Sequence, residues 1–349
     1  MKVAIVNDTP TVVEALRRII ATAPEHQILW TAGDGAEAVR MCAAELPDLI
    51  LMDLIMPKMD GVDATRLIMA QTPCPILIVT SNVEDNAARV FAAMGHGALD
   101  ALDTPQLGSA NPLAAARPLL AKMAALNGLA GGADRPAGRG AAARDRKREP
   151  LIAIGASAGG PAALADILSN LPKTFPAPIV IVQHIDERFA SGMASWLTHH
   201  STLPVRLALE GETPRGGLVL LAGTSDHLVM KAQDRLGYTT VPAEAVYRPS
   251  VDVFLDSLCA HWSGDVIGVL LTGMGSDGAR GLRSLREAGH HTIAQDRATS
   301  AVYGMPKAAA ALAAAIDILP LNKIPTRLFD MLSSAYRGGG GTNGRQDRN

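Results

Sequence analysis

The chain of 349 residues is 48% hydrophobic and 19% charged, which describes a globular protein long enough for about two domains. A formal net charge of -2 gives no electrostatic basis for binding nucleic acid, and no apolar run reaches the roughly 18 residues of a membrane span, so we expect no membrane insertion. The three cysteines, Cys42, Cys74 and Cys259, fit no metal-binding spacing and predict reduced thiols in a cytoplasmic protein. The opening "MKVAIVNDTP" is not typical of a secretory signal.

Residues 1–125 alternate short apolar runs with segments of helical periodicity. The runs that predict strands are VAIV, QILW, LILM, PILIV and GALDAL. Helical periodicity covers residues 11–22, 36–46, 61–71, 86–96 and 111–126. Buried strands that alternate with helices form a parallel sheet covered on both faces, so we predict an α/β domain of this kind.

Polar side chains stand at the carboxyl ends of these predicted strands. Asp8 follows the first strand, Asp53 follows LILM, and Thr80 follows PILIV. Taken singly, each Asp is equally well explained as the cap of a helix or turn. Functional groups of parallel sheets gather beyond the carboxyl strand ends, so together the three predict a site where carboxylates hold Mg²⁺ and one carries a phosphoryl group.

This pattern resembles the receiver domain of two-component response regulators over residues 1–125. The resemblance implies a flavodoxin-like fold with a five-stranded parallel sheet. It makes Asp53 the phosphoacceptor, Asp8 and Asp53 the acids of a Mg²⁺ site, and Thr80 the hydroxyl that contacts the phosphoryl group. The phosphodonor implied is a CheA-type histidine kinase.

Two positions depart from the usual receiver pattern. Asn7 stands where receivers carry a second acid, and Thr104 stands where they carry a lysine before a proline. One carboxylate fewer weakens Mg²⁺ binding, and a missing ammonium removes a partner of the phosphate. We expect Asp53 to be phosphorylated still, with unusual metal dependence and switching.

Composition divides the remainder of the chain. Residues 126–150 are rich in Gly, Ala, Pro and charge without apolar periodicity, which predicts a flexible linker. A second β/α pattern over residues 151–336 predicts a doubly wound, mainly parallel α/β domain. The tail, residues 337–349, has nothing to bury, and we expect it to be disordered.

The stretch "IGASAGG" places Ser157 between a predicted strand and a predicted helix, in the nucleophile-elbow pattern Gly-x-Ser-x-Gly. The small neighbours of this serine suggest a sharp turn with a strained serine backbone. A serine nucleophile needs a base and an orienting acid. His184 and Asp277 each follow a further apolar strand, so a parallel sheet would bring both to the edge where Ser157 lies.

Other interpretations of these residues exist. The glycine-rich turn is also explained as structural or as a phosphate cradle, and Asp277 as a helix cap. "GMGSDG" fits the Gly-x-Gly-x-x-Gly pattern of a dinucleotide enzyme, with Asp296 as the ribose acid, but Asp277 within that loop would repel a pyrophosphate. His227 is most simply structural, whereas Arg248 either lines a binding groove or braces its loop.

The order Ser157, His184, Asp277 differs from that of α/β-hydrolases. With "VQH", "LEGETP", "RPSVDVF", "LTGMGSDGARGL", "AQD" and "VYGMP", residues 151–336 resemble the catalytic domain of CheB-family chemotaxis response regulator protein-glutamate methylesterases. The receiver departures are most similar to the WspF branch. The resemblance implies a Ser-His-Asp carboxylic ester hydrolase without a catalytic cofactor. It also implies a backbone oxyanion donor at Met274.

The implied substrates are glutamyl γ-methyl esters of methyl-accepting chemoreceptors, with deamidation of receptor glutamines as a further activity. We expect a cytoplasmic protein that is recruited to membrane receptor arrays and regulated by phosphorylation of the receiver, which covers the mouth of the catalytic site. Ala158 stands where the family has Thr or Ser, so a supporting hydrogen bond is expected to be absent. The alternative is a receptor-array adaptor whose esterase activity has weakened.

Overall fold

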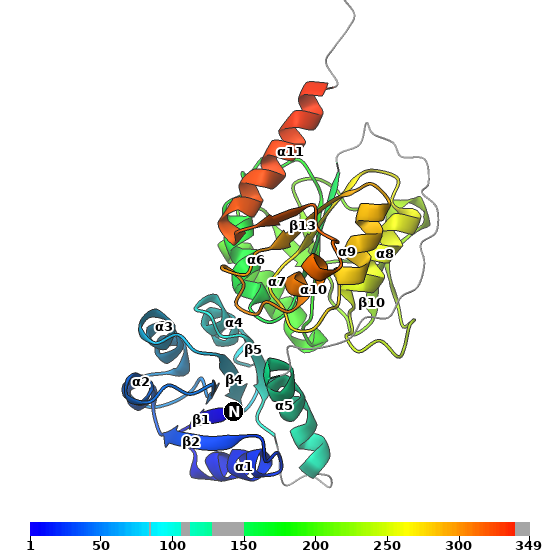
Figure 1. Cartoon of the computed structure of the whole chain (residues 1–349). Coiled ribbons are helices and arrows are strands. Elements are labelled where there is room, and N and C mark those ends of the chain that lie inside the picture. The colour runs from blue at the N-terminus through cyan, green and yellow to red at the C-terminus, as the bar shows by residue number, and fades with distance from the viewer. Residues whose placement is uncertain (84, 106–111, 128–149, 339–349) are drawn as a thin grey trace, which may run out of the picture.

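The computed structural model describes residues 1–83, 85–105, 112–127 and 150–338, which form two α/β domains (Figure 1). Most of the predicted linker at 126–150 and most of the predicted tail at 337–349 lie outside the described residues, but residues 126–127 and 337–338 are helical. Helix α11 (Ile324–Gly338) ends the described chain.

The N-terminal sheet has five parallel strands in the order β2-β1-β3-β4-β5, as the sequence predicts. Its strands are β1 (Lys2–Val6), β2 (Gln27–Ala32), β3 (Leu49–Met52), β4 (Ile76–Thr80) and β5 (Asp100–Asp103). The last strand begins three residues later than the apolar run GALDAL suggests, because Gly97 turns the chain with a φ of 108°.

Helices cover both faces of this sheet. They are α1 (Pro10–Ala21), α2 (Gly35–Ala44), α3 (Gly61–Gln71), α4 (Ala87–Gly95) and α5 (Pro112–Asn127). Alternate strand residues point to opposite faces, so α1 and α5 bury one set of strand side chains and α2, α3 and α4 bury the other. The carboxylates of Asp34 and Asp60 cap α2 and α3 by accepting backbone N–H groups, which fixes where these helices begin.

The C-terminal domain is built on a seven-stranded parallel sheet in the order β14-β13-β12-β6-β7-β9-β8. The strands of this sheet are β6 (Leu151–Ala156), β7 (Ile179–Gln183), β8 (Val205–Leu207), β9 (Val219–Leu221), β12 (Val266–Leu270), β13 (His291–Gln295) and β14 (Asp317–Leu319). A separate antiparallel pair consists of β10 (His227–Lys231) and β11 (Arg235–Thr239).

Helices also cover both faces of the second sheet. They are α6 (Gly160–Ser169), α7 (Glu187–His200), α8 (Val251–His261), α9 (Ala279–Glu287), α10 (Met305–Ala311) and α11, with 3-10 turns at Ala232–Asp234 and Leu321–Lys323. Apolar side chains of α6, α7 and α11 pack on one face, and those of α8, α9 and α10 pack on the other. The doubly wound arrangement predicted from the sequence is confirmed.

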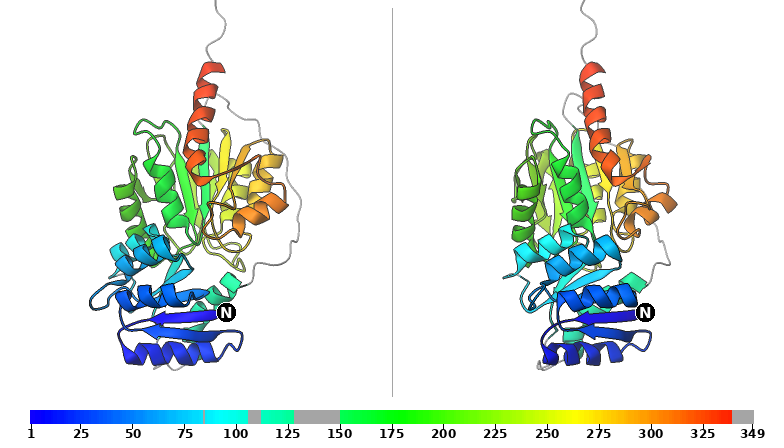
Figure 2. Two further views of the ribbon diagram at one scale, coloured as in Figure 1. Left: turned by 60° about the vertical axis from the view of Figure 1, so that its left-hand side comes forward. Right: turned by 90° about the vertical axis from the view of Figure 1, so that its left-hand side faces the viewer.

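The N-terminal domain lies against one end of the C-terminal sheet (Figure 2). Helix α4 packs on α6 and α7, and one cluster of buried apolar side chains continues from the first domain into the second. Phe91 of α4 is fully buried, with its ring centroid 6.0 Å from that of Trp196 of α7. At the end of β5, the Asp103 carboxylate accepts a hydrogen bond of 2.9 Å from Arg188 Nη1 of α7. The interface is therefore an apolar contact with an ion pair at its side.

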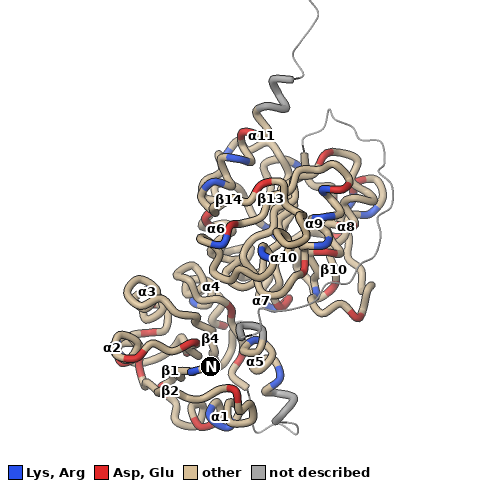
Figure 3. Tube along the Cα trace, in the orientation of Figure 1, with Lys and Arg blue, Asp and Glu red and all other residues tan. Residues whose placement is uncertain are grey.

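Acidic and basic residues are interspersed over both domains, in keeping with the net charge of -2 (Figure 3). Within the part of the chain that the structure describes, no helix combines the length and the apolar character needed to cross a bilayer.

Candidate functional site

Ser157 lies in the tight connection between β6 and α6, at the carboxyl end of the central strand. Its N–H donates to the Thr272 carbonyl at 3.0 Å, and its own carbonyl accepts from Gly160 N–H at 2.7 Å and from the Gln183 side-chain amide at 2.8 Å. The serine is 7% exposed. Main-chain and side-chain contacts therefore hold the Ser157 backbone in one position.

The prediction of a strained backbone at Ser157 is wrong, because this residue has no positive φ. The left-handed residue of the turn is Gly159, with a φ of 74°. A further glycine, Gly273, lets the neighbouring loop approach the serine. A Cβ at Gly273 would lie 2.7 Å from the Ser157 Cβ and 2.2 Å from the Met305 sulfur. Small residues are needed here for close backbone approach rather than for a strained serine.

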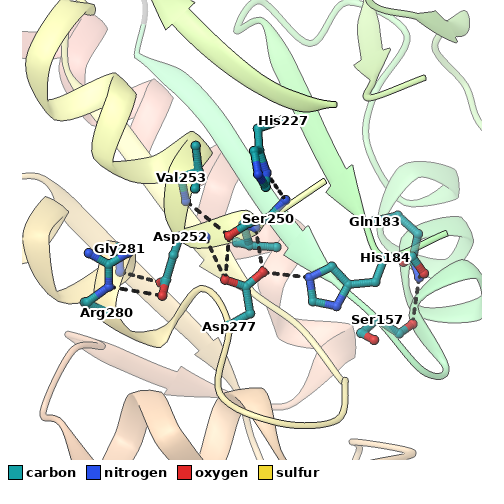
Figure 4. Close-up of polar contacts among 11 residues, drawn as sticks. Ser157, Gln183, His184, His227, Ser250, Asp252, Val253, Asp277, Arg280 and Gly281 are labelled. Carbon is teal, nitrogen blue, oxygen red and sulfur yellow. Dashed lines mark hydrogen bonds and ion pairs between the residues drawn. The ribbon is translucent and has the colours of Figure 1, made fainter. Parts of the chain in front are cut away.

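The structure brings His184 and Asp277 into direct contact beside Ser157. His184 follows β7 directly, and its Nε2 lies 2.7 Å from Asp277 Oδ2. Figure 4 shows the imidazole between the Asp277 carboxylate and Ser157. Parallel strand order explains this meeting, since β12, β6 and β7 are neighbours in the sheet and end at the same edge.

The Asp277 carboxylate is held by the N-terminus of α8 as well as by His184. Its oxygens accept hydrogen bonds from Val251 N–H at 2.7 Å, Asp252 N–H at 3.1 Å and the Ser250 hydroxyl at 2.8 Å. Burial acts to raise the pKa of Asp277, but the hydrogen bond and charge of His184 and these N–H groups outweigh it, so the pKa lies below its usual value. Asp277 is an ionised acceptor near neutral pH.

Sequence reasoning missed Ser250 as a partner of Asp277. Its position before the helical run "VDVF" is the signal that could have identified it, because serine commonly caps helices, and it does cap α8. Asp252 in the same helix is a second carboxylate near Asp277. Burial, followed by the charge of Asp277, raises the pKa of Asp252 to about 6.

The hydrogen bond to Asp277 determines which nitrogen of His184 is free. Because the carboxylate accepts, Nε2 donates, and the neutral imidazole then carries an unprotonated Nδ1. Nδ1 is buried and has no hydrogen-bond partner, so no hydrogen bond joins it to the Ser157 hydroxyl in this structure. An unpartnered buried acceptor next to a serine is suited to receive a proton.

Met274 and Ala158 lie near Ser157 in two different loops, the one after β12 and the one between β6 and α6. Met274 follows Gly273, the residue that abuts Ser157, and Ala158 follows the serine in the chain. Both pack in a small apolar cluster with Leu99 of the N-terminal domain. The Leu99 carbonyl also accepts a hydrogen bond of 3.0 Å from Gly159 N–H. The N-terminal domain therefore contacts the loop that carries the serine.

The other predicted site residues lie in the N-terminal domain, at the carboxyl ends of its strands. Asp53 Oδ2 accepts from the Asn7 side-chain amide at 3.0 Å, and Oδ1 accepts from Leu54 N–H at 2.7 Å. Burial, with a contribution from the charge of Asp8, raises the pKa of Asp53, although the Thr80 hydroxyl opposes this shift. Asp8 is exposed and Thr80 is buried. Among the described residues, no group of three or more His, Cys, Asp or Glu side chains forms a metal site.

His227 and Arg248 both secure the loop between β11 and α8. Fully buried His227 accepts from Ser250 N–H at its Nδ1 and donates from its Nε2 to the Pro242 carbonyl, both at 3.0 Å. Arg248 donates to the Ser225 carbonyl at 3.2 Å and to the Asp226 carboxylate at 3.1 Å. Of the two roles considered for Arg248, these contacts favour bracing the loop.

Comparisons with known proteins identify the families of both domains. Residues 152–328 match the family CheB methylesterase, and residues 3–107 match the response regulator receiver domain. A protein-glutamate methylesterase/protein-glutamine glutaminase of Pseudomonas syringae is 59% identical over 95% of this chain and 100% of its own length. A protein of the same description from Pseudomonas aeruginosa is 56% identical over 95% of this chain and 99% of its own length.

A solved structure also resembles the C-terminal domain. The CheB methylesterase catalytic domain of Thermotoga maritima is 38% identical, with a TM-score of 0.51, and the match covers 53% of this chain and 99% of that one.

Proposed function

Since the chain belongs to the CheB methylesterase family, we propose that it hydrolyses glutamyl γ-methyl esters on methyl-accepting chemoreceptors, with receptor glutamines as further substrates. The observation that carries this proposal is the unpartnered Nδ1 of His184, buried beside Ser157 while Nε2 is bound to an ionised Asp277. This is the arrangement that a general base needs.

The reaction follows from these three side chains. His184 Nδ1 takes the proton of the Ser157 hydroxyl as its oxygen attacks the γ-carbonyl carbon. The tetrahedral intermediate collapses, the bond to the methoxy oxygen breaks, and His184 returns the proton so that methanol leaves. Water then attacks the acyl-enzyme with His184 again as the base, which releases the glutamate and restores Ser157. Asp277 keeps the imidazole oriented and stabilises its charged form.

The negative charge on the attacked oxygen needs N–H donors. We assign one to the backbone of Met274, because Gly273 before it abuts Ser157. One such donor typically lowers the barrier by about 3 kcal/mol. Ala158 offers no hydroxyl for support, but its methyl group packs against Leu99, which gives this departure a role in domain contact.

In the receiver, Asp53 is the proposed phosphoacceptor, with Asp8 and Asp53 as ligands of Mg²⁺ and Thr80 beside them. The two carboxylates repel each other, which a divalent cation would relieve, so the residues fit the ion. Bound Mg²⁺ would neutralise charge on the incoming phosphoryl group. The Asn7 side-chain nitrogen donates to Asp53, and its Oδ1 accepts from Thr9 N–H at 2.8 Å, so the one oxygen of this side chain is already engaged by the backbone. We therefore expect weak Mg²⁺ affinity.

Phosphorylation would act through the contact between the domains. Leu99 packs against Ala158 and Met274 beside the nucleophile, so the docked receiver restricts the approach of a receptor. Asp103, which binds Arg188, pairs in the sheet with Thr80. A phosphoryl group that engages Thr80 can therefore bias the docking equilibrium through β5.

The proposed setting is the cytoplasmic side of membrane receptor arrays, with a CheA-type histidine kinase as phosphodonor. Asn7 and Thr104 support the WspF branch, whose arrays sense surfaces and control cyclic-di-GMP. The second candidate function is a receptor-array adaptor with weakened esterase activity, which Ala158 favours. The intact contact of His184 with Asp277 favours the enzyme.

Mass spectrometry of methylated receptors from the source cell tests the proposal. Wild-type protein should remove methyl groups from receptor glutamates, and Ser157→Ala should leave them in place. Conversion of receptor glutamine to glutamate in the same spectra tests deamidation. Unchanged methylation in the presence of folded, phosphorylated wild-type protein would favour the adaptor.

A further inference from the structure

One aromatic side chain stacks on the imidazole of His184. It belongs to none of the sequence motifs discussed above and has no part in the proposed mechanism. The phenol ring of Tyr247 stacks on the imidazole with a centroid separation of 4.2 Å and an interplanar angle of 3°. Tyr247 belongs to the loop between β11 and α8 and is half-buried. Aromatic rings at this separation attract each other, and the face of a phenol attracts a cation.

The loop that carries Tyr247 is fixed at both ends. His227 binds Pro242 on one side and Ser250 on the other, and Arg248 next to Tyr247 is bound to Asp226. A ring held by such anchors can restrain its neighbour, because it loses little conformational entropy on contact.

Tyr247 also meets the loop assigned to the oxyanion. A Cβ at Gly275 would lie 2.7 Å from the Tyr247 hydroxyl oxygen, so only a glycine admits the phenol at this distance. The φ of 76° at Gly275 requires a glycine as well. Burial, with the charge of Asp277, raises the pKa of Tyr247, so the phenol remains neutral. One neutral ring therefore touches both the base and the oxyanion loop.

We propose that Tyr247 is a positioning residue for His184: its stacked ring holds the imidazole in the plane that directs Nε2 to Asp277 and Nδ1 to Ser157. During the attack the imidazole becomes a cation, and the π face of Tyr247 stabilises that cation next to it. This inference rests on the proposed function. The ring is the active part, so a phenylalanine should replace it and an aliphatic side chain should not.

The test compares Tyr247→Phe, Tyr247→Leu and Tyr247→Met in the full chain at one level of phosphorylation, with Val246→Ala as control. Val246 is 90% exposed on the same loop. The first readout is kcat and KM for methanol release from methylated receptor. The second is the rate at which a small fluorophosphonate inactivates Ser157, which needs the base but no receptor contact.

We expect Tyr247→Phe and Val246→Ala to match wild type, and Tyr247→Leu and Tyr247→Met to lose about tenfold in kcat and in inactivation rate with unchanged KM. Wild-type inactivation rates in both aliphatic variants would overturn the proposal, and so would a phenylalanine variant as impaired as they are. Failure of the proposed function has a different signature, because wild-type protein would then not react with the fluorophosphonate at Ser157.

Discussion

Gly192 offers a direct way to separate the domains without touching the catalytic residues. It lies on α7 and faces α4 of the receiver, where a Cβ would stand 3.0 Å from the Ala87 Cβ and 3.3 Å from the Phe91 ring. A glutamate at this position must displace α4 or prevent docking. Within α7 itself the change should be favourable, since replacing a helical glycine adds about 0.5–1 kcal/mol of stability.

The size of the effect follows from the cost of overpacking a close contact, about 1–3 kcal/mol. This cost shifts the docking equilibrium by about 5- to 150-fold toward the open form. Unphosphorylated Gly192→Glu should therefore release methanol from methylated receptor faster than unphosphorylated wild type, up to the phosphorylated rate. Ser191→Glu, an exposed position of the same helix, is the control and should behave as wild type.

Small-angle scattering completes this experiment, because undocked domains increase the radius of gyration. A Gly192→Glu protein that scatters as two separated domains and yet keeps the slow unphosphorylated rate would refute inhibition by the receiver.

Three further predictions concern the carboxylates of Asp277 and Asp252 and the side-chain amide of Asn7. Asp277→Asn should lower kcat on the order of 10³- to 10⁴-fold with little change in KM, because an amide no longer fixes the tautomer of His184. Steady-state methanol release measures this change, and a variant with wild-type kcat would contradict the role assigned to Asp277. Asp252 has a folded pKa of about 6, above its unfolded value, so its ionisation costs stability as pH rises toward and past 6. Asp252→Asn should therefore gain up to about 3 kcal/mol of unfolding free energy relative to wild type between pH 4 and pH 8 in urea titrations, and a pH-independent difference would contradict this cause. Asn7→Asp should lower the Mg²⁺ concentration that half-saturates phosphorylation of Asp53 by a small-molecule phosphodonor, and an unchanged Mg²⁺ requirement would count against Asp8 and Asp53 as the metal site.

Much of the fold could be predicted because burial leaves a clear pattern in this chain. LILM before Asp53 and the strand before Ser157 are apolar at consecutive positions, which is typical of parallel strands covered on both faces. The same logic placed Ser157, His184 and Asp277 at one edge, since each follows such a strand.

The features that sequence reasoning missed depend on contacts between distant segments. Tyr247 lies in an irregular loop, where no periodicity indicates the direction of a ring. Gly192 and Phe91 read as ordinary helix positions, and only the docked domains give them a role. The prediction of a strained backbone at Ser157 was wrong because the left-handed residue of this turn is Gly159 instead.

Methanol release from purified methylated receptor by wild type and by Ser157→Ala measures the function most directly. We predict that loss of the Ser157 hydroxyl oxygen lowers the rate of methanol release by at least about 10³-fold. The unfolding temperature and the phosphorylation of Asp53 should stay as in wild type. Persistence of methanol release in Ser157→Ala would mean that another group performs the attack and that Ser157 is not the nucleophile.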